Sequence, residues 1–187
     1  NALAPTETVL SLGWPELERV LPDRGLPRGV VEIASPITKQ GAMRGGATTI
    51  ALSAVRAVHA ADARGWCAWI TEANGPPLYA PAVAQAGVDL DRLLIVRPSP
   101  ADLARTVVKV AASGAFDLVV VDAPAGLDGK LSLSDTTPIM GAEAGTGAER
   151  TKRGSTRARV DGSVVVRKLA LAAEEKGTTF LVLTNIY

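Results

Sequence analysis

Asp122, the last residue of the stretch 118–122, has a side chain whose type and position suggest chemistry. Residues 118–121 are four consecutive apolar residues, three of them β-branched, which is typical of a short strand buried on both faces. Asp122 closes this run. In an open α/β sheet, ligands bind beyond the carboxyl ends of the strands, so Asp122 stands where a carboxylate could hold a metal-bound phosphate. The alternative is a carboxylate that caps the next turn.

A glycine-containing stretch before a predicted helix could form the other half of a phosphate site. Such a site needs backbone N–H groups around the phosphates, a lysine on the terminal phosphates and a Ser or Thr hydroxyl on Mg²⁺. Gly46 permits close approach, Thr48 supplies the hydroxyl, and Thr49 follows it. The lysine position, however, is occupied by Ala47. Residues 36–46 are also longer than the pattern G-x-x-x-x-G-K-[ST] allows.

The alanine at the lysine position predicts a strong loss of nucleotide affinity and turnover. A charge-assisted contact of this kind contributes roughly 1.5–3 kcal/mol. Lys39 or Arg44 in the enlarged loop could act as a substitute, although a long loop holds a charge poorly in register. The alternative for the whole stretch is a plain connection between a strand and a helix.

The elements that position these residues alternate between strands and helices. Apolar patterns predict strands at 30–34, 67–71, 93–96, 118–122 and 180–183. They predict helices at 12–21, 47–64, 79–86 and 163–176, with one more opening at residues 98–100, and a loop at 35–46. This alternation predicts an α/β fold with a mainly parallel β-sheet flanked by helices on both faces.

Length and composition favour a single folded domain over residues 1–187. The chain is 47% apolar and carries a net charge of +1, which favours neither strong nucleic-acid attraction nor membrane binding. Cys67 is the sole cysteine, so no internal disulfide forms and a cytoplasmic location is expected. Residues 1–24 are expected to form a helical lead-in and residues 125–161 a mobile loop, with native sequence beyond both ends.

Three further side-chain positions carry expectations of their own. His59 lies in a predicted helix, where a lone histidine is more often structural or exposed than catalytic. Trp66 and Trp69 flank or occupy a strand, which favours core packing over a role as interface anchors. On the last helix, Val166, Leu169, Ala170 and Ala173 are expected to share the buried face.

Residues 142–168 form a basic segment. They contain seven basic and three acidic residues, a net charge of +4 in a chain that carries +1 overall. Such a segment could contact phosphates and bind DNA weakly, through Arg150, Lys152, Arg153, Arg157 and Arg159. It contains no aromatic residue to stack on bases, and a charge run is commonly just a solvated surface.

Four stretches resemble the RecA-type recombinase core, in the order and at the spacing of that family. They are residues 25–33, 87–94, 113–122 and 183–185. The resemblance implies a RecA-like fold, a metal-binding role for Thr48 and the acidic role of the second nucleotide motif for Asp122. It further implies that Glu72 matches the water-activating glutamate and Asn185 the nucleotide-sensing end of the last strand. Ala47 replaces the family's lysine, and Ile186 replaces its glutamine.

A RecA-like core with a degenerate phosphate loop is similar to the ImuA family of the bacterial DNA-damage mutagenesis cassette. That resemblance implies a regulator or adaptor in the SOS response and translesion synthesis. Its expected partners are RecA, ImuB and an error-prone DNA polymerase subunit, with residues 1–21 as one candidate contact surface. No catalytic residue, metal or cofactor is expected, and residual ATP binding stays open.

Two other functions remain open. The chain could be a DNA-dependent ATPase that uses an atypical loop, with Lys39 or Arg44 as the phosphate ligand. It could also be a structural scaffold for the polymerase complex that leaves RecA untouched.

Overall fold

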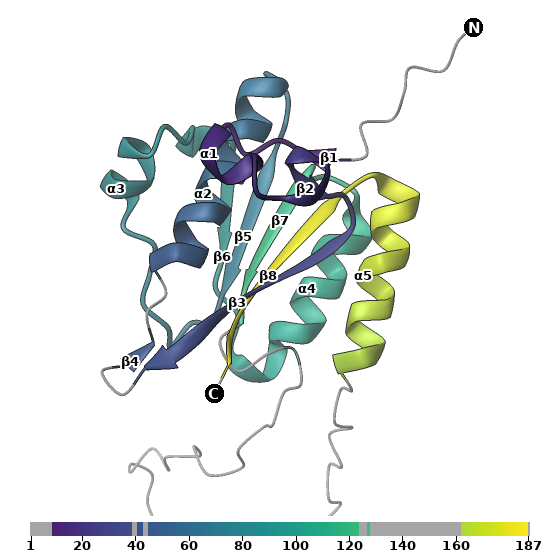
Figure 1. Cartoon of the computed structure of the whole chain (residues 1–187). Helices are drawn as coiled ribbons and strands as arrows, with labels where there is room; N and C mark the ends of the chain where they lie inside the picture. Colours follow the sequence, from purple (N-terminus) through teal and green to yellow (C-terminus); the bar gives the residue numbers. More distant parts are fainter. Residues whose placement is uncertain (1–8, 39–40, 43–44, 124–126, 128–161, 187) are drawn as a thin grey trace, which may run out of the picture.

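The computed structural model describes residues 9–38, 41–42, 45–123, 127 and 162–186 (Figure 1). Their centre is a six-stranded sheet in the order β4-β3-β8-β7-β5-β6. Neighbouring strands pair in parallel except at β4, which is antiparallel to β3. The predicted mainly parallel sheet is confirmed. The strands are β3 (Val30–Thr38), β4 (Gly41–Ala42), β5 (Cys67–Thr71), β6 (Leu93–Val96), β7 (Leu118–Asp122) and β8 (Thr179–Ile186).

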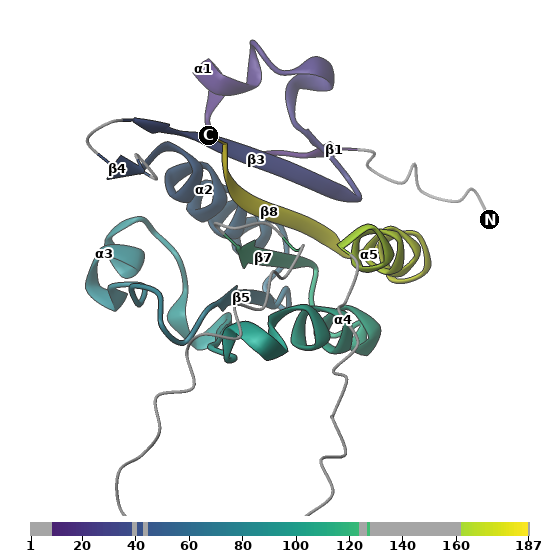
Figure 2. The ribbon, with the colours of Figure 1, turned by 90° about the horizontal axis from the view of Figure 1, so that it is seen from below.

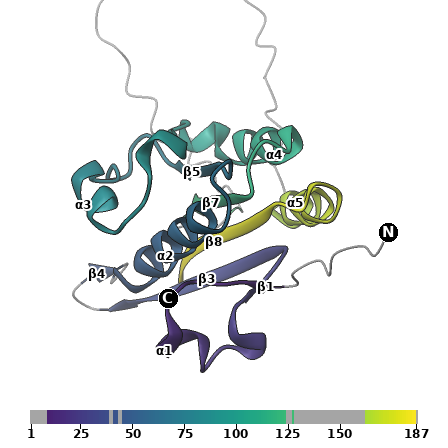
Figure 3. The ribbon, with the colours of Figure 1, turned by 90° about the horizontal axis from the view of Figure 1, so that it is seen from above.

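Helices cover both faces of this sheet, as the alternation of elements predicts. Figures 2 and 3 show α2 and α3 on one side and α4 and α5 on the other. The helices are α1 (Pro15–Glu18), α2 (Gly45–Ala61), α3 (Ala80–Gln85), α4 (Leu103–Ser113) and α5 (Gly162–Lys176). Three 3-10 turns, η1 (Pro22–Arg24), η2 (Leu90–Arg92) and η3 (Pro100–Asp102), and a small β1–β2 pair (Val9–Leu10 with Leu26–Pro27) complete the described elements. No helix among the described residues is long and apolar enough to cross a membrane.

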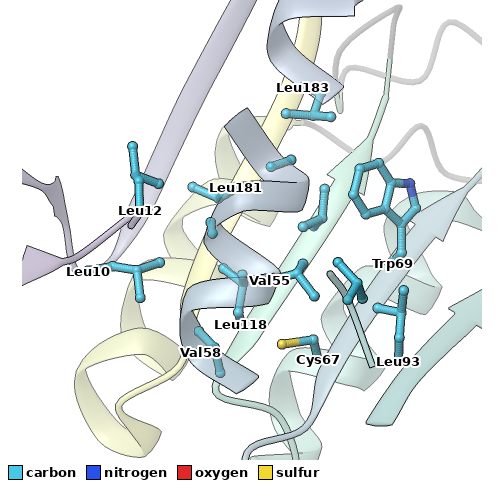
Figure 4. Close-up of a cluster of buried hydrophobic side chains, with 14 of the residues drawn as sticks. Leu10, Leu12, Val55, Val58, Cys67, Trp69, Leu93, Leu118, Leu181 and Leu183 are labelled. Atoms are coloured by element: carbon cyan, nitrogen blue, oxygen red, sulfur yellow. The ribbon is translucent and has the colours of Figure 1, made fainter. Parts of the chain in front are cut away.

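Strand β7 lies at the centre of the sheet, between β5 and β8. Leu118 and Val120 belong to the core cluster beneath α2, which Figure 4 shows. Val119 and Val121 belong to the cluster beneath α4 and α5. All four side chains are fully buried, so the predicted burial on both faces is confirmed. The alternation of a strand therefore directs one apolar run into two cores.

The predicted loop at 35–46 is wrong over most of its length. Strand β3 continues to Thr38, and residues 37–38 pair with Gly41 and Ala42 of β4. The extension is stabilised from outside the segment, because β8 pairs in parallel with β3 as far as Pro36. The extra length relative to a phosphate-binding loop is thus a small hairpin between the strand and α2. Lys39 and Arg44 lie outside the described residues.

The predicted helix at 12–21 is reduced to the single turn α1. The Glu18 carboxylate accepts hydrogen bonds from the N–H groups of Leu12, at 2.6 Å, and Gly13, at 3.0 Å, and from the Ser11 hydroxyl. These bonds hold the preceding residues in a non-helical turn and lower the pKa of Glu18, with the bond from Ser11 as the largest cause. Val20, near the end of this stretch, is 76% exposed.

Some packing expectations hold and others are wrong. Trp69 is 1% exposed and belongs to the core as expected, whereas Trp66 is 45% exposed because it precedes β5 at the rim of the sheet. On α5, Leu169 is buried and Ala173 packs against the core as expected, but Val165 is buried in place of Val166, which is 43% exposed. Of the expected mobile loop at 125–161, the structure describes Leu127 alone.

Candidate functional site

Two of the side chains predicted to bind a nucleotide, Thr48 and Asp122, meet at a hollow near the carboxyl ends of β3, β7 and β8. Thr48 comes from the first turn of α2, and Asp122 ends β7. Neighbouring parallel strands and the helix that follows β3 bring them together. The hollow has a volume of about 10 Å³ and is lined by Ser35, Ala47, Thr48, Asp122, Leu183, Thr184 and Asn185.

This hollow is the size of one water molecule. A cavity needs about 10–15 Å³ to hold a water, whereas sites for small ligands usually measure about 300–1,000 Å³. None of its described lining residues is lysine or arginine. The N-terminus of α2 still gives the hollow a positive dipole end, since Ala47 and Thr48 belong to the first turn of that helix. What remains is a small polar niche with three hydroxyl residues, a carboxylate and an amide.

Ala47 is part of the core as well as part of the hollow. It is 6% exposed and packs in the cluster beneath α2. Gly46 is exposed, and a Cβ added there would meet no atom within 4 Å. Thr49 is exposed on the next turn. Packing among the described residues therefore does not require a glycine at 46, and Thr49 does not line the hollow.

Two hydroxyl residues at the site were not recognised from the sequence. Ser35 is 6% exposed and lines the hollow, but the residue falls in the segment expected to be a loop. Thr184 is 8% exposed, and its Oγ1 donates to Glu32 Oε1 at 2.6 Å across the β3–β8 pair. In the folded chain Val31, Ile33 and Ser35 alternate with more exposed residues, which is the period of a strand that continues through Ser35.

Glu72 lies in a separate turn beside the hollow and does not line it. It follows Thr71, which pairs in register with Asp122 across β5 and β7. The turn is closed by the Gly75 N–H, which donates to the Glu72 carbonyl at 3.0 Å, and the Ala73 N–H donates to the Pro98 carbonyl at 2.8 Å.

Arg97 fastens this turn to the end of β6. Its Nη2 donates to the carbonyl oxygens of Ala73 and Gly75, at 2.7 Å in both cases. One guanidinium thus holds the segment that follows Glu72. Nothing in the local sequence predicts this role, because the contact joins two loops that neighbour each other only in the folded sheet.

Replacing Arg97 by alanine is expected to loosen the turn without unfolding the domain. The carbonyl oxygens of Ala73 and Gly75 would lose their shared donor, which should lower the local free energy of opening by about 1–2 kcal/mol. Exchange of the Ala73 and Gly75 amides should therefore accelerate roughly 5–30-fold. Hydrogen exchange followed by NMR measures this. The matched control is Arg105→Ala on the exposed face of α4, which should leave both amides unchanged. Equal exchange in Arg97→Ala and the parent protein would contradict the assignment.

The basic residues proposed for DNA or partner contact lie outside the described residues. They are Arg150, Lys152, Arg153, Arg157 and Arg159. Arg167 and Lys168, from the same basic segment, are exposed on α5. In the part of the chain that the structure describes, no three His, Cys, Asp or Glu side chains are grouped closely enough to hold a metal ion.

Comparison with known proteins identifies similar sequences. Residues 5–183 match the RecA N-terminal domain family. The chain is 38% identical over 130 residues to Protein RecA of Rhodospirillum centenum, covering 68% of this chain and 33% of that protein. It is 38% identical over 122 residues to Protein RecA of Deinococcus radiodurans, covering 64% and 31%.

The chain therefore spans about a third of the length of these relatives. Among solved structures, SulA from Pseudomonas aeruginosa is similar with a TM-score of 0.47 at 14% identity, covering 84% of this chain and 98% of that one.

Proposed function

This chain belongs to the RecA N-terminal domain family, and on that premise we propose that it is a non-catalytic regulator that binds RecA. In this proposal it modulates homologous recombination during the DNA-damage (SOS) response. It also acts in mutagenic translesion synthesis, as an adaptor for ImuB and an error-prone polymerase subunit. The setting is the cytoplasm, and DNA contact is weak and secondary.

The replacement of lysine by Ala47 carries this proposal. A phosphate anchor must place a cation beside the terminal phosphates, but the residue at this position is a small apolar side chain packed in the core. The neighbouring niche has room for about one water, and no cation lines it among the described residues. Loss of the anchor removes the main electrostatic contact to a nucleotide, while the RecA-like scaffold and its surfaces persist.

RecA is proposed as the partner because the two proteins share a fold. A domain that shares a RecA-like sheet can present surfaces complementary to RecA while lacking the chemistry that drives RecA's own cycle. The expected role is therefore that of a subunit mimic, which occupies a RecA surface without responding to nucleotide. ImuB and the polymerase subunit enter the proposal through the resemblance to the ImuA family.

Two titrations test the proposal together. In calorimetry with Mg²⁺–ATP at millimolar concentration, no saturable heat is expected, and in interferometry with immobilised RecA, saturable binding is expected. Saturable nucleotide binding without RecA binding would overturn the proposal that the chain is a RecA regulator. Binding of ImuB or the polymerase subunit without RecA binding would favour a polymerase scaffold instead.

One observation favours a second candidate, a DNA-dependent ATPase with an atypical loop. Thr48, Asp122 and Asn185 do meet at the N-terminus of α2, as a nucleotide site requires. In this alternative Lys39 or Arg44 supplies the missing cation. If ATP binds, the variants Lys39→Ala and Arg44→Ala should identify the ligand, since one of them should abolish the binding.

A further inference from the structure

The single histidine of the chain lies at the C-terminal end of α2, away from the site described above. His59 is 6% exposed, and its Nδ1 accepts a hydrogen bond from the Asp89 N–H at 3.3 Å. An accepting Nδ1 fixes the neutral tautomer with its proton on Nε2. That Nε2 has no hydrogen-bond partner among the described residues. A buried imidazole thus acts here as an acceptor, which requires it to be uncharged.

Arg92 completes the contact between the segment 89–92 and the end of α2. Its Nη1 donates to the Asp62 carbonyl at 2.8 Å and its Nη2 to the His59 carbonyl at 3.2 Å. Its Nε donates to Asp89 Oδ2 at 2.8 Å, while Asp89 Oδ1 accepts from the Asp91 N–H. The guanidinium therefore caps carbonyls that the helix end leaves without partners inside the helix.

These hydrogen bonds of His59, Asp89 and Arg92 hold the edge of the sheet. The segment 89–92 leads directly into β6, which stands at the end of the strand order in the described sheet. Leu94 and Ile95 of β6 are 43% and 40% exposed, so this strand has less packing than β7 or β8. The contacts at His59 and Arg92 therefore link this edge to the helix layer, beside the packing of Val88 and Leu93 in the cluster beneath α2.

Protonation of His59 conflicts with the hydrogen bond from the Asp89 N–H and with the Arg92 guanidinium, whereas the Arg92 backbone and the Asp89 carboxylate favour the charged imidazole. A charged imidazole carries protons on both nitrogens, so Nδ1 would face the Asp89 N–H as a second donor. The Arg92 guanidinium, which bonds the His59 carbonyl, repels a second cation. The Asp89 carboxylate opposes this repulsion but is already paired with Arg92.

The other charged groups near this helix end do not stabilise the imidazolium. Asp62 is exposed, and its Oδ1 accepts from the Arg64 N–H. Arg56, one turn earlier on α2, donates to the Gly13 carbonyl. The Cys67 thiol on β5, which also feels the Arg92 charge, stays neutral because burial raises its pKa to about 12.

From this geometry we propose that His59 is a pH-operated lock, which fastens edge strand β6 to α2 when neutral and releases that edge when protonated. Burial, followed by the Arg92 charge, lowers the pKa of His59 below its ordinary 6.5. In an opened edge the histidine regains its ordinary pKa. The open state therefore binds a proton more tightly than the closed state does. The lock is fully effective above the ordinary pKa and weakens as the pH falls below it.

The direct test is an NMR titration combined with hydrogen exchange on the whole chain. Because the chain has one histidine, its imidazole signals report this pKa without ambiguity. Between about pH 7.5 and 5.5, the protection factors of the β6 amides should fall up to about tenfold, the limit for uptake of one proton. Those of central strand β7 should stay constant over the same range.

The variant His59→Gln provides the matched control. A glutamine can accept the Asp89 N–H and does not titrate, so protection of β6 in this variant should be independent of pH. An imidazole that titrates at or above 6.5 in the parent protein would overturn the lock. Parallel loss of protection in β6 and β7 would also overturn it, because it would show global unfolding instead of release of one edge.

Discussion

Trp69→Ala is expected to lower the free energy of unfolding by about 3–5 kcal/mol, the range for removal of a large buried aromatic side chain. Trp69 is 1% exposed and packs beneath α2 with Val55 and Leu93 in the first core cluster (Figure 4). The cavity left by the indole cannot close readily, because the sheet fixes one wall and α2 the other. Its Nε1 has no partner among the described residues, so Trp69→Phe should cost much less.

The chain offers a close control for this prediction. Trp66 stands three residues earlier and is 45% exposed, so Trp66→Ala should cost less than about 1 kcal/mol. Urea denaturation followed by far-ultraviolet circular dichroism measures both variants without relying on tryptophan fluorescence. Equal losses at the two positions would contradict the packing described for β5.

Val120→Asp is expected to prevent folding under ordinary conditions. Val120 is fully buried in β7, the strand between β5 and β8. An ionised carboxylate there would have no partner, and protonation would still leave a buried polar group in an apolar cluster. The cost should exceed about 4 kcal/mol, which is a large part of the stability of a domain this size.

The matched substitution is Val164→Asp on α5, where the side chain is 47% exposed. That variant should keep the circular dichroism spectrum and nearly the melting temperature of the parent protein. Val120→Asp should lose the cooperative melting transition. A cooperative transition retained in Val120→Asp would show that β7 is not the central strand of the sheet.

Three of the strands were predictable because their signals are local. Strands β5, β6 and β7 begin and end where the short apolar runs do, since turn residues bound each run. The extension of β3 was not predictable in the same way. Ser35 and Pro36 are typical of loops, and their strand conformation depends on pairing with β8, 150 residues later in the chain.

The site was predictable where topology alone determines position. Parallel strands end at one edge of the sheet, so Thr48, Asp122 and Asn185 had to lie near one another. No comparable rule predicts which loops contact each other. Arg97, which holds the turn after Glu72, and Arg92, which caps α2, act through carbonyl oxygens that a sequence pattern does not reveal.

RecA-catalysed DNA strand exchange with this protein titrated in is the measurement that tests the central claim most directly. Each titration should be run at fixed RecA, ATP and salt concentrations, with denatured protein as the control. The regulator account predicts a dose-dependent change in the rate of exchange, with no ATP hydrolysis by the added protein on its own. Unchanged strand exchange at a large molar excess of the folded protein would contradict it.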